Sequence, residues 1–129
     1  GVLTVVRLFP RLRLLSLKGT AATDKGIVEL SRLKNLKILY LDYTQATDKS
    51  VNAVYKLPLS ILFLTGTRIT DQSLSKIATM KDLQQLSLAR CSLLSKQAIS
   101  ELQKKRPLLA IMLKDDSNPL RQDFFGISD

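Results

Sequence analysis

A six-residue leucine pattern recurs along this chain at a nearly constant interval, and it constrains the fold more than any other feature of the sequence. Copies of Leu-x-x-Leu-x-Leu begin at Leu12, Leu36, Leu59 and Leu83, and a weaker copy begins at Leu108. A module of this size cannot bury its apolar face alone, so neighbouring modules must stack to form a continuous core. We therefore predict short strands that start near residues 12, 36, 59, 83 and 108.

The segment that precedes each strand has the spacing of a helix. Apolar residues fall three apart in it, which places them on one buried stripe. They are Ile27, Leu30 and Leu33; Val51, Val54 and Leu57; Leu74, Ile77 and Met80; and Ile99 and Leu102. The same spacing puts Leu3, Val6 and Phe9 on a stripe before the first strand. Residues 1–11 are thus predicted to end a preceding unit, and the chain is expected to begin in mid-repeat.

A recurring turn joins each strand to its helix. A threonine opens this turn in three units and Cys91 replaces it in the fourth, where a small side chain must satisfy backbone groups as the chain leaves the strand. The next predicted core position is held by Ala22, Ala46, Ile69 and Leu93. Thr-Asp pairs follow in the first three units and are predicted to cap the helices, with Ser95 in place of the aspartate in the fourth.

Together these positions resemble the cysteine-containing and ribonuclease-inhibitor-like classes of leucine-rich repeat, which occur in F-box substrate adaptors and in a mitochondrial ATP-synthase coupling-factor family. The resemblance covers residues 1–113. It implies an α/β fold, a right-handed solenoid of about five repeats with a parallel sheet on its concave face and helices on its convex face. Residues 114–129 are predicted to form a C-terminal cap or tail, in which Phe124 and Phe125 pack back onto the final unit.

Composition is consistent with one soluble domain that has an aliphatic core, because 45% of residues are apolar but only 5% are aromatic. The net charge of +9 favours an acidic partner, although a solvated basic surface explains the same number. The single cysteine excludes an intrachain disulfide and a multi-cysteine zinc site, and it favours an intracellular, reducing compartment, either cytoplasmic or mitochondrial. No apolar run is long enough to predict a membrane span.

Most of the residue types that catalysis requires are missing or poorly placed. The chain has no histidine, and its five glycines form no phosphate-binding loop. Cys91 is interpreted as a structural residue of the turn rather than as a nucleophile. Asp115 and Asp116 are interpreted as part of a solvated tail rather than as a cation site. We therefore expect no enzyme activity, no cofactor, no metal site and no small-molecule substrate.

The residues between the leucines of each strand are predicted to face away from the core and to form the binding surface. Large apolar side chains gather there on three adjacent strands, at Leu14, Ile38, Tyr40, Ile61 and Phe63. A contiguous exposed apolar patch usually marks an interface, and aromatic side chains concentrate binding energy. Arg13 and Lys37 belong to a polar, partly basic rim. A shifted strand register, or cover by the chain's own ends, is the alternative explanation of the patch.

Two functions are compatible with these features. The first is a non-catalytic interaction module that binds a partner protein through the concave face, as a subunit or adaptor of a larger complex does. The second is a basic, assembly-bound subunit that contacts nucleic acid or anionic lipid through its convex helical face, where most of the remaining lysines and arginines are predicted to lie. Binding of the second kind would weaken steeply as salt rises, whereas binding of the first would respond little.

Overall fold

The computed structural model describes residues 1–115, in which strands and helices alternate. The strands are β1 (Leu14–Ser16), β2 (Ile38–Tyr40), β3 (Ile61–Phe63), β4 (Gln85–Ser87) and β5 (Ala110–Met112). The helices are α1 (Val2–Leu8), α2 (Asp24–Ile27), α3 (Asp48–Val54), α4 (Asp71–Ile77) and α5 (Lys96–Lys105), and the 3-10 helix η1 (Val28–Arg32) continues α2. Each strand begins two residues after the leucine that opens its motif, because the first leucine belongs to the approach to the strand.

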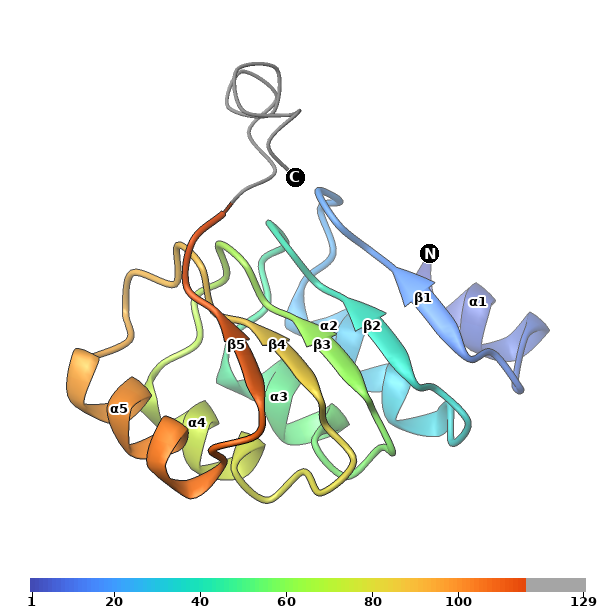
Figure 1. The fold of residues 1–129 in the computed structure, drawn as a ribbon. Coiled ribbons are helices and arrows are strands. Elements are labelled where there is room, and N and C mark those ends of the chain that lie inside the picture. Colours follow the sequence, from blue (N-terminus) through green and yellow to red (C-terminus); the bar gives the residue numbers. More distant parts are fainter. Residues whose placement is uncertain (116–129) are drawn as a thin grey trace, which may run out of the picture.

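All five strands form one parallel sheet in chain order, from β1 at one edge to β5 at the other (Figure 1). The register is the one that the repeat predicts: Leu15, Leu39, Leu62, Leu86 and Ile111 lie side by side. The rows on either side of this leucine row are also continuous across the sheet. A shifted register therefore does not explain the predicted apolar patch.

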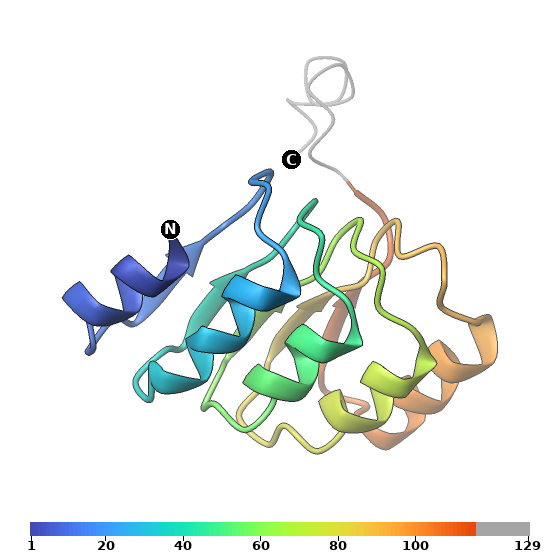
Figure 2. The ribbon, with the colours of Figure 1, turned by 180° about the vertical axis from the view of Figure 1, so that it is seen from behind.

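The helices all lie on one face of the sheet, as Figure 2 shows from behind. Between the helices and the sheet lies an aliphatic core, in which the helical stripe and the strand leucines are buried. The other face of the sheet carries none of the helices described here (Figure 1), and we call it the open face. The chain is thus an α/β protein with a five-stranded parallel sheet, in which the helices leave one sheet face available.

Five individual predictions about the core are wrong, one of them Leu113, which is 44% exposed, and all five lie before β1 or after β4. Leu3 and Phe9 are exposed, because α1 has a neighbouring helix on one side only within residues 1–115 and buries Val6 instead. Leu93 is 46% exposed, since the fourth turn contains one extra residue and Leu94 packs against the core in its place. Leu108 is almost fully exposed and the next residue, Leu109, is buried.

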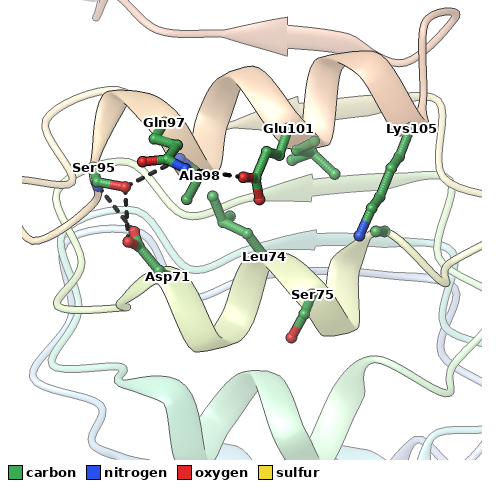
Figure 3. A pocket seen from close by; sticks show the side chains of 10 residues that line it. Asp71, Leu74, Ser75, Ser95, Gln97, Ala98, Glu101 and Lys105 are labelled. Atoms are coloured by element: carbon green, nitrogen blue, oxygen red, sulfur yellow. Dashed lines mark hydrogen bonds between the residues drawn. The ribbon is translucent and has the colours of Figure 1, made fainter.

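Hydrogen bonds from one helix start to the next connect the units on the helical side. The Asp48 carboxylate accepts bonds from the backbone N–H of Thr70 (2.8 Å), the Thr70 hydroxyl (2.5 Å) and the Ser73 hydroxyl (2.5 Å). Asp24 makes the same three bonds with the following unit, and Asp71 makes two of them (Figure 3). We call Asp24, Asp48 and Asp71 the aspartate ladder.

The prediction that the Thr-Asp pairs cap their helices is confirmed for the threonines of two units, since Thr47 and Thr70 accept bonds from backbone N–H groups of their own helices. It is incomplete for the aspartates, whose side chains bond to the following unit. In the fourth unit Ser95 takes the place of the threonine, and Lys96 stands where the other units have aspartate. Each aspartate therefore ties its helix to the next unit.

These hydrogen bonds also lower the pKa values of Asp24 and Asp48. Burial raises the pKa of Asp48, but hydrogen bonds from Ser73 and Thr70 outweigh this effect, so that its pKa lies below the usual 3.8. The pKa of Asp24 is lowered in the same way, because bonds from Ser50 and Thr47 outweigh burial. The Asp24 and Asp48 carboxylates are therefore ionised at neutral pH and stabilise the stack most in that form.

Candidate functional site

The predicted binding residues come together on the open face. Leu14 on β1 is 50% exposed, and its partners in the register, Ile38 on β2 and Ile61 on β3, are partly exposed. Tyr40 and Phe63 form the next row on β2 and β3 and are also partly exposed. We call these five residues the apolar patch. The sheet holds the patch in place, because every member lies in a paired strand whose central leucine packs on the core: Leu39 and Leu62 are buried and Leu15 is partly buried.

Tyr40 and Phe63 pack directly on each other. Their ring centroids are 5.1 Å apart and their planes are inclined by 77°, an edge-to-face arrangement that fixes both rings. Because the rings support each other, they present a preformed aromatic surface. Ordering such a surface costs little conformational entropy when a partner binds.

The two basic residues of the predicted rim lie beside the patch. Backbone N–H groups of Lys37 and Ile38 both donate to the carbonyl oxygen of Arg13, which places Arg13 and Lys37 on adjacent units immediately before β1 and β2. Arg13 is exposed and Lys37 is partly exposed. Neither side chain forms an ion pair with another residue of the described segment.

At the other end of the strands, the predicted polar rim is buried in its central part. Asp42, Thr65 and Ala89 follow β2, β3 and β4, and Asp42 is only 4% exposed. The Thr65 hydroxyl is bonded to that of Ser87 at 2.7 Å. The Oδ1 atom of Asp42 is fully buried and has no hydrogen-bond partner in residues 1–115. Sequence position alone places these three residues on the open face, but it does not predict that they are buried from solvent.

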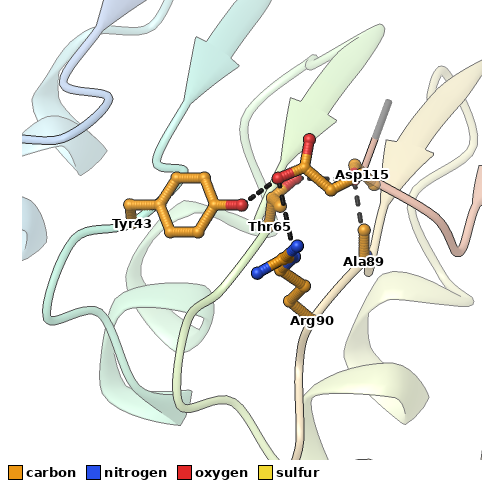
Figure 4. A network of polar contacts seen from close by, with 6 residues as sticks. Tyr43, Thr65, Ala89, Arg90 and Asp115 are labelled. Carbon is orange, nitrogen blue, oxygen red and sulfur yellow. Dashed lines mark hydrogen bonds and ion pairs between the residues drawn. The ribbon is translucent and has the colours of Figure 1, made fainter. Parts of the chain in front are cut away.

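Beyond this row, Tyr43 and Arg90 meet Asp115 (Figure 4). The Tyr43 hydroxyl donates to the Asp115 carboxylate, and Arg90 Nε lies 3.8 Å from the same carboxylate. The hydrogen bond to Asp115, followed by burial, raises the pKa of Tyr43. Asp115 was interpreted as a solvated tail residue, and this interpretation is wrong: it connects the chain after β5 to the second unit.

The backbone of the turn explains why Tyr43 reaches so far. Tyr43 and Arg90 have φ angles of 56° and 55°, and Gly19 and Gly66 occupy the same turn position with φ of 70°. At Gly66 a Cβ atom would lie 2.5 Å from the Tyr43 ring. Glycine adopts this left-handed backbone without the strain that Tyr43 and Arg90 bear, and at position 66 it also leaves room for the Tyr43 ring.

Cys91 lies in the buried turn, as predicted. Its thiol donates to the carbonyl oxygen of Leu64 at 3.1 Å and lies 3.8 Å from the hydroxyl of Thr67. Burial raises the pKa of the Cys91 thiol, which lowers the fraction of reactive thiolate at neutral pH. These contacts support a structural role for Cys91.

One basic residue of the helical side is committed to the fold. The Arg106 guanidinium donates to the carbonyl oxygens of Met80 (2.6 Å) and Leu83 (3.0 Å) in the preceding unit. Most of the remaining lysines and arginines are predicted to lie on the convex helical face as surface charge. Arg106 does not belong with them, because its guanidinium group is used in hydrogen bonds within the chain.

A groove of about 270 Å³ between α4 and α5 is visible in Figure 3. Small side chains, Ser75, Ala78 and Ala98, are among the residues that line it, and Asp71 and Ser95 are hydrogen-bonded to each other at its edge. Its ionisable groups do not converge on a common point, and nothing in the sequence predicted it.

In residues 1–115, the helices are too short or too polar to span a lipid bilayer.

Comparison with known proteins bears on the fold only. No protein-family model and no curated protein matches the sequence. Among solved structures, the chain is similar to leiomodin-1 actin-binding site 2, with a TM-score of 0.70 and 14% sequence identity over 98% of this chain and 84% of that one. At this identity the similarity shows a shared architecture and does not assign a function.

Proposed function

We propose that this chain is a right-handed leucine-rich-repeat solenoid of the cysteine-containing or ribonuclease-inhibitor-like class, and that its open face is concave and binds a partner protein without catalysis. The apolar patch is the observation that carries this proposal. It places Leu14, Ile38 and Ile61 beside the packed rings of Tyr40 and Phe63 on a face without helices. Aromatic anchors within an apolar centre, with Arg13 and Lys37 at the margin, have the composition of a protein interface.

The structural comparison supports a protein partner in a limited way. The similar segment of leiomodin-1 is named for the binding of actin, a protein. The same architecture is thus compatible with protein recognition, while the identity of the partner depends on side chains that differ between the two chains. We accordingly propose a protein partner and a role as a subunit or adaptor of a larger complex.

The proposal is tested by removing both aromatic anchors. We expect Tyr40→Ala combined with Phe63→Ala to abolish capture of partner proteins by the immobilised chain, with the captured proteins identified by mass spectrometry. Tyr55→Ala is the matched control, because Tyr55 is a partly exposed aromatic residue at the end of α3 on the helical side. Circular dichroism would establish that both variants remain folded. Retention of the same proteins by the double variant would rule out the patch as the interface.

A second candidate function rests on the positive charge of the helical side. Lys56 and Lys76 place their ammonium groups 5.9 and 5.1 Å from the Tyr55 ring centroid, which concentrates charge around one aromatic residue. Such a surface suits nucleic acid or anionic lipid. Fluorescent single-stranded RNA and phosphatidylserine vesicles are suitable probes: affinity that falls steeply with salt and is lost in Lys56→Glu with Lys76→Glu would favour this function.

A further inference from the structure

We propose that Asp42 is a recognition site within the open face and that it binds an arginine or lysine side chain of the partner. This inference rests on the proposed function, because it names the chemistry that the partner must place beside the apolar patch. The partner would be a peptide segment in which a basic side chain follows apolar ones. Asp42 would supply the acceptor oxygens for that basic group.

The first observation is that Asp42 is buried without compensation. It is 4% exposed, and its Oδ1 atom has no hydrogen-bond partner in residues 1–115. A buried carboxylate that lacks partners costs folding free energy, and buried charges in proteins are normally paired or hydrogen-bonded. An incoming cation would remove this cost, so that binding and relief of the unpaired charge would be coupled.

The second observation concerns the residues that surround this position: Thr65 is the equivalent of Asp42 in the next unit, and Ser87 lies on β4 in register with Phe63. Thr65 and Ser87 are bonded to each other through their hydroxyls, which uses one of their two hydroxyl hydrogens. On the other side Lys18 is exposed and forms no ion pair with Asp42. Asp42, Thr65 and Ser87 are all buried, so the side-chain oxygen atoms of this region are withdrawn from solvent. A guanidinium group, with several N–H donors in one plane, suits the unpaired carboxylate oxygen of Asp42.

The third observation is the distance from the apolar patch. Asp42 follows Tyr40 by two residues on the same side of β2, a separation of about 7 Å along the strand. A peptide that covers Tyr40 and Phe63 would bring a neighbouring side chain to Asp42. Asp42 is also acidic at a position whose equivalents in the first and fifth units are Lys18 and Lys114. The second unit is therefore the place on this row where a positively charged side chain of the partner would bind.

A selection experiment tests this inference directly. The immobilised chain is used to select from a phage-displayed library of random 12-residue peptides, in parallel with Asp42→Asn and with the Tyr40→Ala, Phe63→Ala double variant. We expect peptides selected on the wild type to be enriched in arginine or lysine beside apolar residues. Asp42→Asn should remove the basic enrichment and keep the apolar one. Binding of a selected peptide, measured by fluorescence anisotropy, should weaken about tenfold or more in Asp42→Asn.

The outcomes separate the inference from the proposed function. Equal basic enrichment on the wild type and Asp42→Asn, or an apolar enrichment without basic residues, would overturn the role of Asp42 and leave the apolar patch standing. Enrichment that survives in the Tyr40, Phe63 double variant would overturn the proposed function itself. A wild type that enriches no peptides would count against both.

A stability measurement excludes an internal explanation. If Lys18 is the true partner of Asp42, then Asp42→Asn and Lys18→Gln should both lower the urea midpoint of unfolding. Under our inference Asp42→Asn raises the midpoint, because a neutral amide is less costly to bury, and Lys18→Gln leaves it unchanged. A matched decrease in the two variants would contradict the proposal.

Discussion

Aspartate side chains are hydrogen-bonded differently on the two sides of this molecule. On the helical side Asp24 and Asp48 are only partly buried, yet each accepts three hydrogen bonds from the following unit. On the open face Asp42 is more deeply buried, yet its Oδ1 atom accepts none from residues 1–115. The difference shows that the helical side is organised to hold units together, whereas the open face contains a carboxylate oxygen that residues 1–115 leave without a hydrogen-bond partner.

The repeat explains why the two sides differ. Asp24 and Asp48 meet the same helix start in the following unit, so one threonine and one serine satisfy each of them, and Ser95 takes the place of the threonine for Asp71. On the open face the row that contains Asp42 changes from unit to unit, through Lys18, Asp42, Thr65, Ala89 and Lys114. Because the residues of this row do not repeat, they can differ between units and encode recognition.

The largest expected effect comes from breaking the ladder at its centre. Asp48→Ala removes three charge-assisted bonds and leaves the Ser73 hydroxyl, which is almost fully buried, without its acceptor. We expect the free energy of unfolding to fall by about 2–4 kcal/mol. Urea denaturation followed by circular dichroism measures this change.

Asp82→Ala is the matched control for Asp48→Ala. Asp82 is exposed and makes no hydrogen bond or ion pair with the part of the chain that the structure describes. Its removal should change the free energy of unfolding by less than about 0.5 kcal/mol. Equal losses in the two variants would mean that the ladder bonds are not the cause.

The next effect is the response of the ladder to acid. The pKa values of Asp24 and Asp48 lie below 3.8 in the folded chain, so the unfolded chain binds protons more readily in this range. Their contribution to stability is therefore complete above about pH 4 and is lost as the pH falls through the folded pKa values. The urea midpoint of the wild type should drop between pH 5 and pH 2. We expect a smaller drop in the double variant Asp24→Asn, Asp48→Asn, which lacks both ionisable groups. An identical drop would show that other groups control acid unfolding.

A smaller effect of opposite sign is expected at Asp42. Asparagine has the shape of aspartate without its charge, so Asp42→Asn should raise the free energy of unfolding by about 1 kcal/mol. Differential scanning calorimetry at pH 7 measures the change, with Asp82→Asn as the exposed comparison. If Asp42→Asn destabilises the chain, then Asp42 has a partner in solution and resembles the ladder aspartates after all.

The leucine repeat made a large part of the fold predictable, because a constant interval determines the order, register and buried stripes of the units. The apolar patch was predictable for the same reason, as shown by the register of Ile38 with Ile61 and of Tyr40 with Phe63. Tyr43 and Asp115, by contrast, are 72 residues apart, and no local pattern connects them. A contact that occurs only once between two units cannot be predicted from the repeat interval.

The ladder was missed for a different reason. A Thr-Asp pair before a helix fits a cap, and local reasoning assigned both residues to their own helix. The signal that could have corrected this was the serine three residues after Thr47 and Thr70, at Ser50 and Ser73, which a cap does not require. Both serines are buried, and their hydroxyls donate to the aspartate of the preceding unit.

The smallest predicted effect comes from adding the hydrogen bond that Asp71 lacks and that Asp24 and Asp48 have. Asp71 accepts two bonds from Ser95, and Ala98 occupies the position that Ser50 and Ser73 hold in the other units. Ala98→Ser should add the third bond and raise the free energy of unfolding by about 0.5 kcal/mol, since one hydrogen bond exceeds the small loss of helix propensity. The gain should vanish when Asp71 is already replaced by alanine, and a double-mutant cycle measures this coupling. A gain that persists without Asp71 would show that the serine stabilises α5 alone, and the distinction between a ladder bond and a helix cap would fail at this step.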